Sequence, residues 1–366
     1  MAERGAAPAV PLAGRRALSL LRSFTHPLRP DDYLELINPL WSTRELRGRI
    51  ERIERHTATA ATVLIKPGWE WPGHRPGQYM RLGVEVDGVH HWRAYSLTSD
   101  PGRPDGRIAI TPKLVDGGRV SPYLLRRARP GTIVRLGGVE GTFCLPDPIP
   151  ARLLFISAGS GITPIMSMLR SLSARGALGD VIHVHSERSA DGVIFGGELG
   201  ALRRAHAGYR LHVRLSGREG RLAPVQLDGI CPDWRAREAF LCGPPGLLRA
   251  MRERWRHDGD GGRLHTEHFQ PDEALGAGEH GAGGSISFCA SEVAAHSDGT
   301  QPILVAGEQA GAKLAHGCRM GICHSCVGRL RSWRVRDLRT GSVQGQPGEI
   351  VRICINAPEG PVEIDL

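Results

Sequence analysis

The sequence predicts three domains in a row: an antiparallel β-barrel, an α/β layer with a parallel sheet, and a compact α+β segment. Residues 44–148 hold short β-branched and aromatic runs that Pro-Gly and Gly-Gly turns separate. Residues 149–270 alternate strand-like with helix-like patterns. A glycine-rich stretch, 271–284, has the composition of a linker before the last segment, 285–366. With residues 1–43 as an N-terminal extension, a chain of 366 residues has room for these three domains.

The expected elements follow from local patterns in each domain. In the first domain, the strand candidates suit a closed or nearly closed antiparallel barrel and are residues 57–65, 79–86, 92–98, 107–113 and 132–136. In the second, a helix is expected at 164–175 and strands at 152–157, 181–185, 209–215 and 239–241. In the third, a helix near 305–312 precedes closing strands at 350–354 and 362–365.

Composition and cysteine count favour a cytoplasmic protein. No run approaches the ~20 apolar residues of a membrane-spanning helix, and the N-terminus lacks the apolar core of a signal peptide. Eight cysteines are too few for a disulfide scaffold in a chain of this size. A reducing compartment is therefore expected.

The net charge of +9 comes almost entirely from arginine, since only Lys66, Lys113 and Lys313 are lysines. This bias is typical of genome composition, and no nucleic-acid partner is expected. Residues 285–366 are balanced in charge, so the excess lies before them. It either attracts phosphorylated cofactors or an acidic surface, or it is an ordinary solvated surface.

The N-terminal extension contains a short basic amphipathic stretch, residues 15–24, which reads R-R-A-L-S-L-L-R-S-F. Such a stretch either lies on an anionic membrane at its inner face or forms a partly ordered arm. Residues 31–41 are more apolar, and we expect them to pack on the body of the protein.

The strongest motif is a set of four cysteines. Cys318, Cys323 and Cys326 stand at C-x4-C-x2-C spacing, and Cys354 follows them at a distance. This arrangement is typical of the ligands of a plant-type 2Fe–2S cluster. Structural zinc prefers two closely spaced pairs, which this uneven triplet does not form. The spacing therefore predicts a 2Fe–2S cluster.

A predicted barrel strand carries a second candidate site. Arg93, Tyr95 and Ser96 offer a cation, an aromatic face and a hydroxyl, which suit a flavin's pyrophosphate, planar ring and ring edge. An ordinary exposed strand face is the alternative. Nearby, residues 118–121 read as a helix start with Ser121 as its cap, a place where free amides attract phosphate.

The α/β domain carries two glycine motifs. Gly159-Ser160-Gly161-Ile162-Thr163-Pro164 follows an apolar strand and opens a helix, the setting in which a dinucleotide approaches backbone amides. Pro164 stands where a full G-x-G-x-x-G motif has its third glycine. Cys242-Gly243-Pro244 follows a later strand of the same sheet and should reach the same edge. A buried free cysteine before a turn is the alternative for Cys242.

Together these motifs resemble the ferredoxin–NADP reductase superfamily over residues 44–366, with a plant-type β-grasp ferredoxin domain fused at the C-terminus. More narrowly, the whole chain, including residues 34–41, is similar to the bacterial NADPH-dependent reductases that serve membrane acyl-CoA (stearoyl-CoA) desaturases. The resemblance implies an oxidoreductase that passes electrons from NADPH through FAD to a 2Fe–2S cluster, and on to a partner oxygenase or desaturase.

The resemblance also implies roles for the residues of the flavin site. Tyr95 would pack on the isoalloxazine, and Ser96 would hydrogen-bond the nitrogen that accepts hydride. Thr98 resembles members that use FAD, and Thr111 and Lys113 match the strand along the flavin's nucleotide half. The flavin pyrophosphate would be bound by Arg93, Gly118, Arg119, Val120 and Ser121. The relatives' terminal aromatic has no counterpart at this chain's end, so Phe269 is expected near the flavin.

On the nucleotide side, Cys242 would face the nicotinamide, and the resemblance makes Ser96, Tyr95 and Cys242 the catalytic set. The dinucleotide would be held by Gly159, Ser160, Gly161, Thr163, Gly243 and Pro244. Ser216, Arg188 and Arg218 are candidates for a 2′-phosphate. Glu187 is the nearest acid that would favour a bare ribose. We therefore expect NADPH and keep NADH as the alternative.

The partner is less defined by sequence than the cofactors. Besides a desaturase, the client is expected among soluble ring-hydroxylating or epoxidising oxygenases, and a redox sensor without turnover is a more distant alternative. An arginine-rich hairpin after the third cysteine either docks an acidic patch on the acceptor or is simply solvated. Its arginines are Arg329, Arg331, Arg334, Arg336 and Arg339. The sequence indicates no oligomeric state.

Overall fold

The computed structural model describes residues 35–42, 44–269, 281–317, 319, 321 and 324–366. The described residues up to Glu267, apart from His91–Ala94, form one compact unit, and the described residues from His268 onward belong to another. Within the described ranges, no helix is long and apolar enough to cross a membrane. The 15–24 stretch lies outside these ranges, and the exact domain boundaries stay a prediction.

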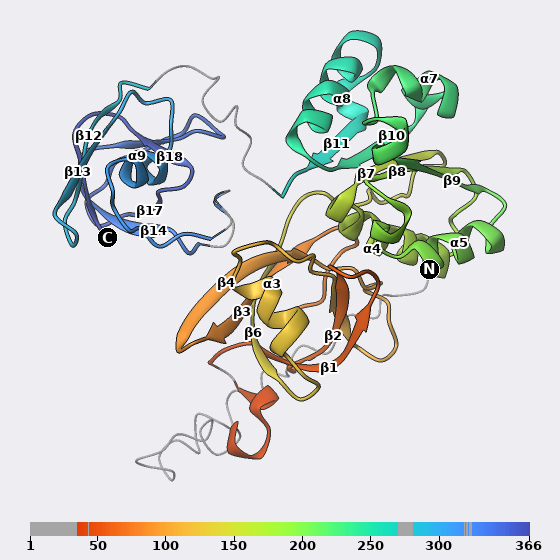
Figure 1. Ribbon diagram of the computed structural model, residues 1–366, viewed down its shortest axis with the longest axis horizontal. Helices are drawn as coiled ribbons and strands as arrows, with labels where there is room; N and C mark the ends of the chain where they lie inside the picture. Colours follow the sequence, from red (N-terminus) through yellow and green to blue (C-terminus); the bar gives the residue numbers. More distant parts are fainter. Residues whose placement is uncertain (1–34, 43, 270–280, 318, 320, 322–323) are drawn as a thin grey trace. The chain divides into compact units, whose positions relative to one another are not determined.

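The first domain is a six-stranded sheet in the order β4-β3-β6-β1-β2-β5 (Figure 1). Its strands are β1 (Arg47–Arg55), β2 (Ala61–Pro67), β3 (Tyr79–Val86), β4 (Val89–Ser96), β5 (Ile108–Ile110) and β6 (Ile133–Glu140). An antiparallel bridge between Leu97 and Ile110 joins the two edges. The predicted closed or nearly closed antiparallel barrel is therefore confirmed. The sequence patterns had named no strand for β1, because its polar residues Arg47, Glu51 and Arg55 mask its alternation.

A short helical segment packs over the barrel. It starts as α3 (Val120–Pro122) and continues as the π-helical turn η2 (Tyr123–Arg127). Leu124 and Leu125 insert into the barrel core. This packing fixes the loop before Val120, where the sequence predicts phosphate contacts.

The second domain is a parallel five-stranded sheet in the order β11-β10-β7-β8-β9. Its strands are β7 (Leu153–Ala158), β8 (Val181–Glu187), β9 (Tyr209–Leu215), β10 (Glu238–Cys242) and β11 (Leu264–Glu267). Strand order reverses between β7 and β10, and ligands of such sheets bind outside the carboxyl ends at that point. The predicted α/β layer is confirmed.

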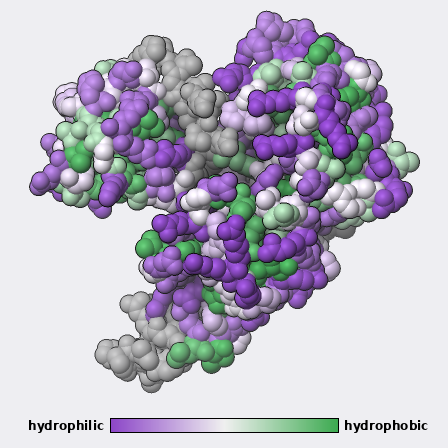
Figure 2. All heavy atoms as spheres, viewed as in Figure 1, coloured by the Kyte–Doolittle hydropathy of each residue, from purple (hydrophilic) through white to green (hydrophobic). Residues whose placement is uncertain are grey.

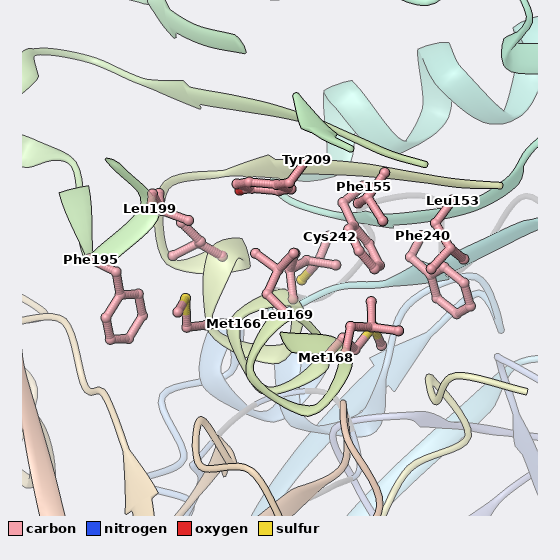
Figure 3. Packing of buried hydrophobic residues seen from close by; sticks show 14 of the residues in the cluster. Leu153, Phe155, Met166, Met168, Leu169, Phe195, Leu199, Tyr209, Phe240 and Cys242 are labelled. Carbon is pink, nitrogen blue, oxygen red and sulfur yellow. The ribbon is translucent and has the colours of Figure 1, made fainter. Parts of the chain in front are cut away.

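Helices cover both faces of this sheet. The longer ones are α4 (Ile162–Ala174), α5 (Gly196–Ala205) and α8 (Pro245–Asp258). The shorter ones are η3 (Gly159–Gly161), η4 (Ala190–Gly192), α6 (Ser216–Glu219), η5 (Pro224–Gln226), α7 (Leu227–Ile230), η6 (Trp234–Ala236) and η7 (Gly261–Arg263). On one face, Met166 and Leu169 of α4 belong to one buried cluster with Phe155 and Phe240 (Figure 3). On the other, Trp255 of α8 packs beside Trp234.

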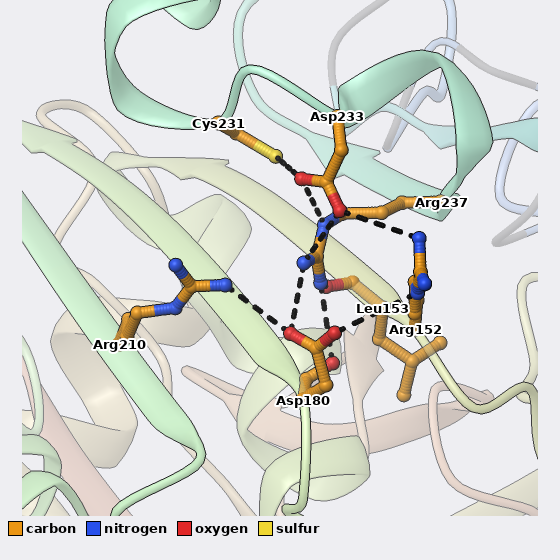
Figure 4. A network of polar contacts seen from close by, with 7 residues as sticks. All are labelled: Arg152, Leu153, Asp180, Arg210, Cys231, Asp233 and Arg237. Atoms are coloured by element: carbon orange, nitrogen blue, oxygen red, sulfur yellow. Dashed lines mark hydrogen bonds and ion pairs between the residues drawn. The ribbon is translucent and has the colours of Figure 1, made fainter.

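The amino edge of the same sheet is closed by a polar network (Figure 4). Arg237, only 2% exposed, pairs with Asp233 at 2.9 Å and with Asp180 at 2.8 Å. It also donates to the carbonyl of Leu153 at 3.3 Å. A buried guanidinium needs such partners, so this edge is structural and the opposite, carboxyl edge remains for ligands.

The C-terminal domain combines a five-stranded sheet, β13-β12-β19-β14-β17, with a three-stranded one, β16-β15-β18. The strands are β12 (Gly284–Phe288), β13 (Val293–Ser297), β14 (Val327–Ser332), β15 (Val335–Asp337), β16 (Val343–Gln344), β17 (Ile350–Arg352), β18 (Asn356–Pro358) and β19 (Val362–Asp365). Helix α9 (Ile303–Gln309) packs its Ile303 and Leu304 into the core. Gly284, which the sequence assigned to the linker, already belongs to β12.

Candidate functional site

Strand β4 ends at Ser96, and this residue is the clearest sign of a bound group in the barrel. Its side chain is 6% exposed. The Oγ atom is buried and has no hydrogen-bond partner among the described residues. A buried hydroxyl without a partner is costly, and a ligand atom that accepts or donates a hydrogen bond removes the cost. The residue therefore fits the predicted flavin contact.

Arg93 and Tyr95 lie on the same strand. Arg93 is partly exposed, and its Nη1 atom donates to the carbonyl of Trp92 at 2.7 Å. Tyr95 is half-buried against the barrel core. The cation and the aromatic ring of the predicted trio therefore share strand β4 with Ser96, and their contacts with a flavin stay a prediction.

Thr98 and Thr111 form part of a buried chain of hydroxyls. Thr98 Oγ1 lies 3.3 Å from Thr111 Oγ1. Thr111 Oγ1 lies 2.8 Å from Thr62 Oγ1, which lies 2.7 Å from His56 Nε2. These two predicted flavin residues thus satisfy each other inside the barrel, and their contact with FAD stays a prediction.

The phosphate-binding loop differs from its predicted form. Helix α3 begins at Val120, with Arg119 in the N-cap position and no side-chain cap. The prediction of Ser121 as a cap is wrong, because Ser121 lies inside the helix and its Oγ accepts from the amide of Val115 at 3.1 Å. The amide of Gly118 already donates to the carbonyl of Val115 at 3.0 Å. The first helical amides, after Gly118, remain the ones that point out of the helix toward a phosphate.

The glycine turn after β7 meets the end of β10, as the sequence predicts. Gly159 has a φ of +56°, which favours glycine. A Cβ at Gly161 would collide with the carbonyl oxygen of Cys242. Thr163 Oγ1 donates to the carbonyl of Ser160 at 2.9 Å and holds the turn. The two motifs therefore converge at the carboxyl edge, next to the strand-order reversal.

Cys242 and Glu267 are register partners on β10 and β11 at this edge. Cys242 is fully buried, and burial raises the pKa of its thiol well above the usual range, with the nearby Glu267 adding to the effect. Glu267 Oε2 is also buried without a partner among the described residues, and burial raises the pKa of this carboxyl to about 8. A neutral thiol and a neutral carboxyl thus stand together at neutral pH.

The sequence patterns assigned no role to Glu267, although Phe269, two residues later, was expected near the flavin. The available signal was its position at the end of a strand of the parallel sheet. Phe269 is 36% exposed, and its expected place near the flavin stays a prediction.

The segments after β8 and β9 lie side by side. Ser216 Oγ donates to the carbonyl of Glu187 at 3.2 Å, and the amide of Gly217 donates to the carbonyl of Arg188 at 3.0 Å. The side chains of Arg188 and Arg218 are exposed. The three candidates for a 2′-phosphate are therefore brought to one place.

Lys113 and Glu187 form an ion pair between the barrel and the α/β domain. Lys113 Nζ donates to Glu187 Oε2 at 3.2 Å, and Glu187 is 8% exposed. The amide of Arg188 donates to Glu187 Oε1 at 2.9 Å. The carboxylate of Glu187, which would otherwise favour a bare ribose, is thus bound by Lys113 and the Arg188 amide.

In the C-terminal domain, Cys326 and Cys354 are buried, at 1% and 2% exposure, and neither is in a disulfide. The amide of Gly321 donates to Cys354 Sγ at 3.2 Å. Backbone φ angles are positive at Arg319, Gly321 and His324, so the loop curls tightly at this point. Amide donors to ligand sulfurs stabilise iron–sulfur clusters, and this geometry fits the predicted 2Fe–2S cluster. Cys318 and Cys323 lie outside the described residues.

The arginine-rich hairpin is largely paired within its own domain. Arg331 pairs with Asp365 at 2.7 Å, and Arg339 pairs with Asp337 at 2.8 Å. Arg336 pairs with Glu359. Of the five arginines proposed for docking, these three have acidic partners already, whereas the exposed Arg329 and Arg334 form no ion pair within the described part of the chain.

The fold and these sites define a flavin- and iron–sulfur-dependent NAD(P)H oxidoreductase. Residues 69–144 match the oxidoreductase FAD-binding domain, residues 155–253 the oxidoreductase NAD-binding domain, and residues 288–358 the 2Fe-2S iron-sulfur cluster binding domain. These matches provide the three cofactor-binding functions that the sequence predicts.

Whole-chain relatives agree. The chain is 46% identical over 345 residues to the NADPH oxidoreductase of Mycobacterium tuberculosis, covering 93% of this chain and 90% of that protein. It is 30% identical over 319 residues to the glycine betaine monooxygenase reductase subunit of Pseudomonas aeruginosa, covering 80% of this chain and 87% of that protein. Phthalate dioxygenase reductase has the same fold, with a TM-score of 0.58 and 21% identity. The match covers 88% of this chain and 98% of that protein. The chain belongs to the family of the NADPH oxidoreductase.

Proposed function

We propose that this enzyme is the reductase component of an oxygenase system. When bound, FAD accepts a hydride from NADPH and the 2Fe–2S cluster carries single electrons, so the pair converts a two-electron donor into a one-electron supply. The observation that carries the proposal is the Gly321 amide aimed at the buried Cys354 thiol, in a chain that also holds the dinucleotide edge at Gly161 and Cys242. Relatives named as reductase subunits of glycine betaine and 3-ketosteroid monooxygenases support it.

The chain's own residues are proposed to bind and orient. Ser96 hydrogen-bonds the reactive edge of the flavin, and Tyr95 packs on its ring. Cys242, kept as a neutral thiol by burial, shapes an apolar contact for the nicotinamide. Cys318, Cys323, Cys326 and Cys354 hold the cluster.

NADPH is the proposed donor. The exposed guanidiniums of Arg188 and Arg218 suit a 2′-phosphate, and Glu187, the competing acid, is engaged by Lys113. The M. tuberculosis relative is also named for NADPH. Comparing kcat/KM for NADPH and NADH, before and after Arg218→Ala, tests this. The variant should lose about tenfold or more with NADPH and little with NADH, and equal losses with both would contradict it.

A membrane acyl-CoA desaturase is the proposed client. The resemblance of the whole chain supports it, as do Leu36 and Ile37, which are 80% and 72% exposed and follow the basic stretch 15–24 in the sequence. Figure 2 shows hydrophobic atoms at this end of the described chain. Apolar side chains next to arginines suit a peripheral position on an anionic membrane.

The experiment that tests the function supplies NADPH, the purified reductase and each candidate acceptor in turn. Desaturation of a stearoyl-CoA substrate by a desaturase in membranes is expected, with none when the reductase is omitted. Turnover only with a soluble oxygenase would replace the desaturase by the alternative client. If the protein does not reduce cytochrome c or ferricyanide with NADPH, the proposal of an enzyme is wrong and a redox sensor without turnover replaces it.

A further inference from the structure

Helix α4 connects the predicted dinucleotide edge to the backbone that follows strand β4. Its first turn follows the Gly159–Gly161 turn at the dinucleotide edge. Further along, Ser167 and Arg170 lie one turn apart and therefore on the same face. At ~1.5 Å per residue, Arg170 is about 13 Å along the axis from Gly161. An α-helix of this length is a rigid connection between the two points.

Both side chains donate to the backbone that follows the flavin strand. Ser167 is fully buried, and its Oγ donates to the carbonyl of Ser99 at 2.7 Å. Arg170 Nη1 donates to the carbonyl of Thr98 at 2.6 Å. Strand β4 ends only two residues before Thr98, at Ser96. The helix of the dinucleotide domain thus holds the barrel directly beside the residue expected to contact the flavin.

Arg170 is itself held rigidly. Its Nε and Nη2 atoms donate to Glu198 Oε1 and Oε2 at 2.8 and 2.6 Å, a bidentate pair. The guanidinium lies over the Phe195 ring, 5.1 Å from its centroid. Phe195 in turn meets His56 of the barrel edge-on, with centroids 4.7 Å apart. All three guanidinium nitrogens of Arg170 therefore donate hydrogen bonds, and a lysine ammonium could not reproduce the arrangement.

We propose that Ser167 and Arg170 are positioning residues for hydride transfer, which set the separation of the nicotinamide and flavin sites. The inference rests on the proposed function and deepens it. Hydride transfer needs reacting atoms about 3–3.5 Å apart, and a misplacement of about 1 Å costs on the order of 100-fold in rate. The hydrogen bonds from Ser167 to Ser99 and from Arg170 to Thr98 fix the barrel against α4.

The test follows flavin reduction under anaerobic, single-turnover conditions in the holoenzyme, before any acceptor is involved. Arg170→Lys and Ser167→Ala are compared with Arg175→Lys, an exposed control at the end of the same helix. Arg170→Lys should slow reduction by NADPH about 10-fold or more and Ser167→Ala severalfold. FAD content and the Kd for NADPH should stay within about twofold, and Arg175→Lys should match wild type.

Two further readouts separate positioning from a merely structural role. With NADPH deuterated at the transferred position, the isotope effect should become more temperature-dependent in both variants, because the donor–acceptor distance is less constrained. In the FAD-free variants, hydrogen–deuterium exchange should be faster than in FAD-free wild type only around residues 97–100 and in α4. An unchanged reduction rate in both variants overturns the proposal, and so does a loss explained wholly by FAD content or Kd. If wild type itself is not reduced by NADPH, the proposed function fails and this inference with it.

Discussion

The backbone amide of Gly321 donates to the Sγ atom of Cys354 at 3.2 Å. Gly321 has a φ of +72°, and a Cβ there would collide with Ile355. The residue is therefore required as glycine for two reasons: its backbone conformation and its close approach to a core side chain. This contact links the sequence of the cysteine loop to the proposed chemistry of its cluster.

Gly321→Ala should lose the cluster and keep flavin reduction by NADPH. The collision with Ile355 displaces the loop and removes the amide donor from Cys354. Iron and acid-labile sulfide content, with visible absorbance, measures the loss. Gly341→Ala is the matched control, because Gly341 has a φ of +75° but open space around its Cβ position. Equal cluster content in both variants would mean that the contact with Ile355 is unimportant.

Ser96→Ala should slow flavin reduction by about 10- to 100-fold without destabilising the protein, because a donor to a reacting group is removed. The Ser96 Oγ atom has no described protein partner to lose. The thermal midpoint of the FAD-free protein should therefore stay the same or rise slightly. An unchanged reduction rate, or a marked fall in that midpoint, would assign Ser96 a structural role.

Glu267 should make NADPH binding weaken as the pH rises through about 8, the pKa to which burial raises its carboxyl. Below that pH the folded protein holds it neutral, and above it an anion stands beside the dinucleotide edge. The same pKa shift makes folding stability fall as the pH rises from 4.5, the ordinary pKa of the carboxyl, to about 8. The reason is that the unfolded chain releases the proton at the lower pH. Glu267→Gln should remove the step in a pH series of Kd. A step that persists in the variant would exclude Glu267 as its source.

The α/β domain should lose stability in mild acid because of two buried histidines on β8. Ser157 Oγ lies 2.8 Å from His183 Nε2 and 2.9 Å from His185 Nδ1, and Tyr209 Oη lies 2.8 Å from His183 Nδ1. Burial lowers the pKa of His183 well below 6.5 and that of His185 to about 4. The unfolded chain binds these protons first, so stability is complete above 6.5 and falls as the pH drops toward 4.

Protonation of His185 alone should lower the free energy of opening β8 by about 2 kcal/mol as the pH falls from 7 to 5. Hydrogen exchange of the β8 amides, corrected for the intrinsic pH dependence of exchange, measures this. His185→Gln, which does not titrate, should show a smaller difference between the two pH values. Equal protection of wild type at both pH values would contradict the assignment.

Much of the fold and part of the site could be predicted because their signals are local. The spacing of Cys318 to Cys326 and the strand-glycine-helix pattern at Gly159 depend on residues close in sequence. Strands 79–86, 209–215 and 362–365 are found at those bounds. The predicted fold class was confirmed for the same reason.

The missed features depend on distant contacts. Ser121 reads as a helix cap, but the Val115 amide reaches its hydroxyl across the loop. Glu267 became notable only through the burial that raises its pKa. The bonds from Arg170 to Glu198 and Thr98 join segments far apart in the chain. No periodicity or spacing reports such contacts.

An anaerobic titration with NADPH, followed by visible spectroscopy, tests the central claim most directly. If the chain couples a two-electron flavin to a one-electron cluster, complete bleaching should take about 1.5 equivalents of NADPH per chain. Cys354→Ser, without its cluster, should take about one. Bleaching of wild type that ends at one equivalent, with the cluster absorbance unchanged, would contradict electron transfer from the flavin to the cluster.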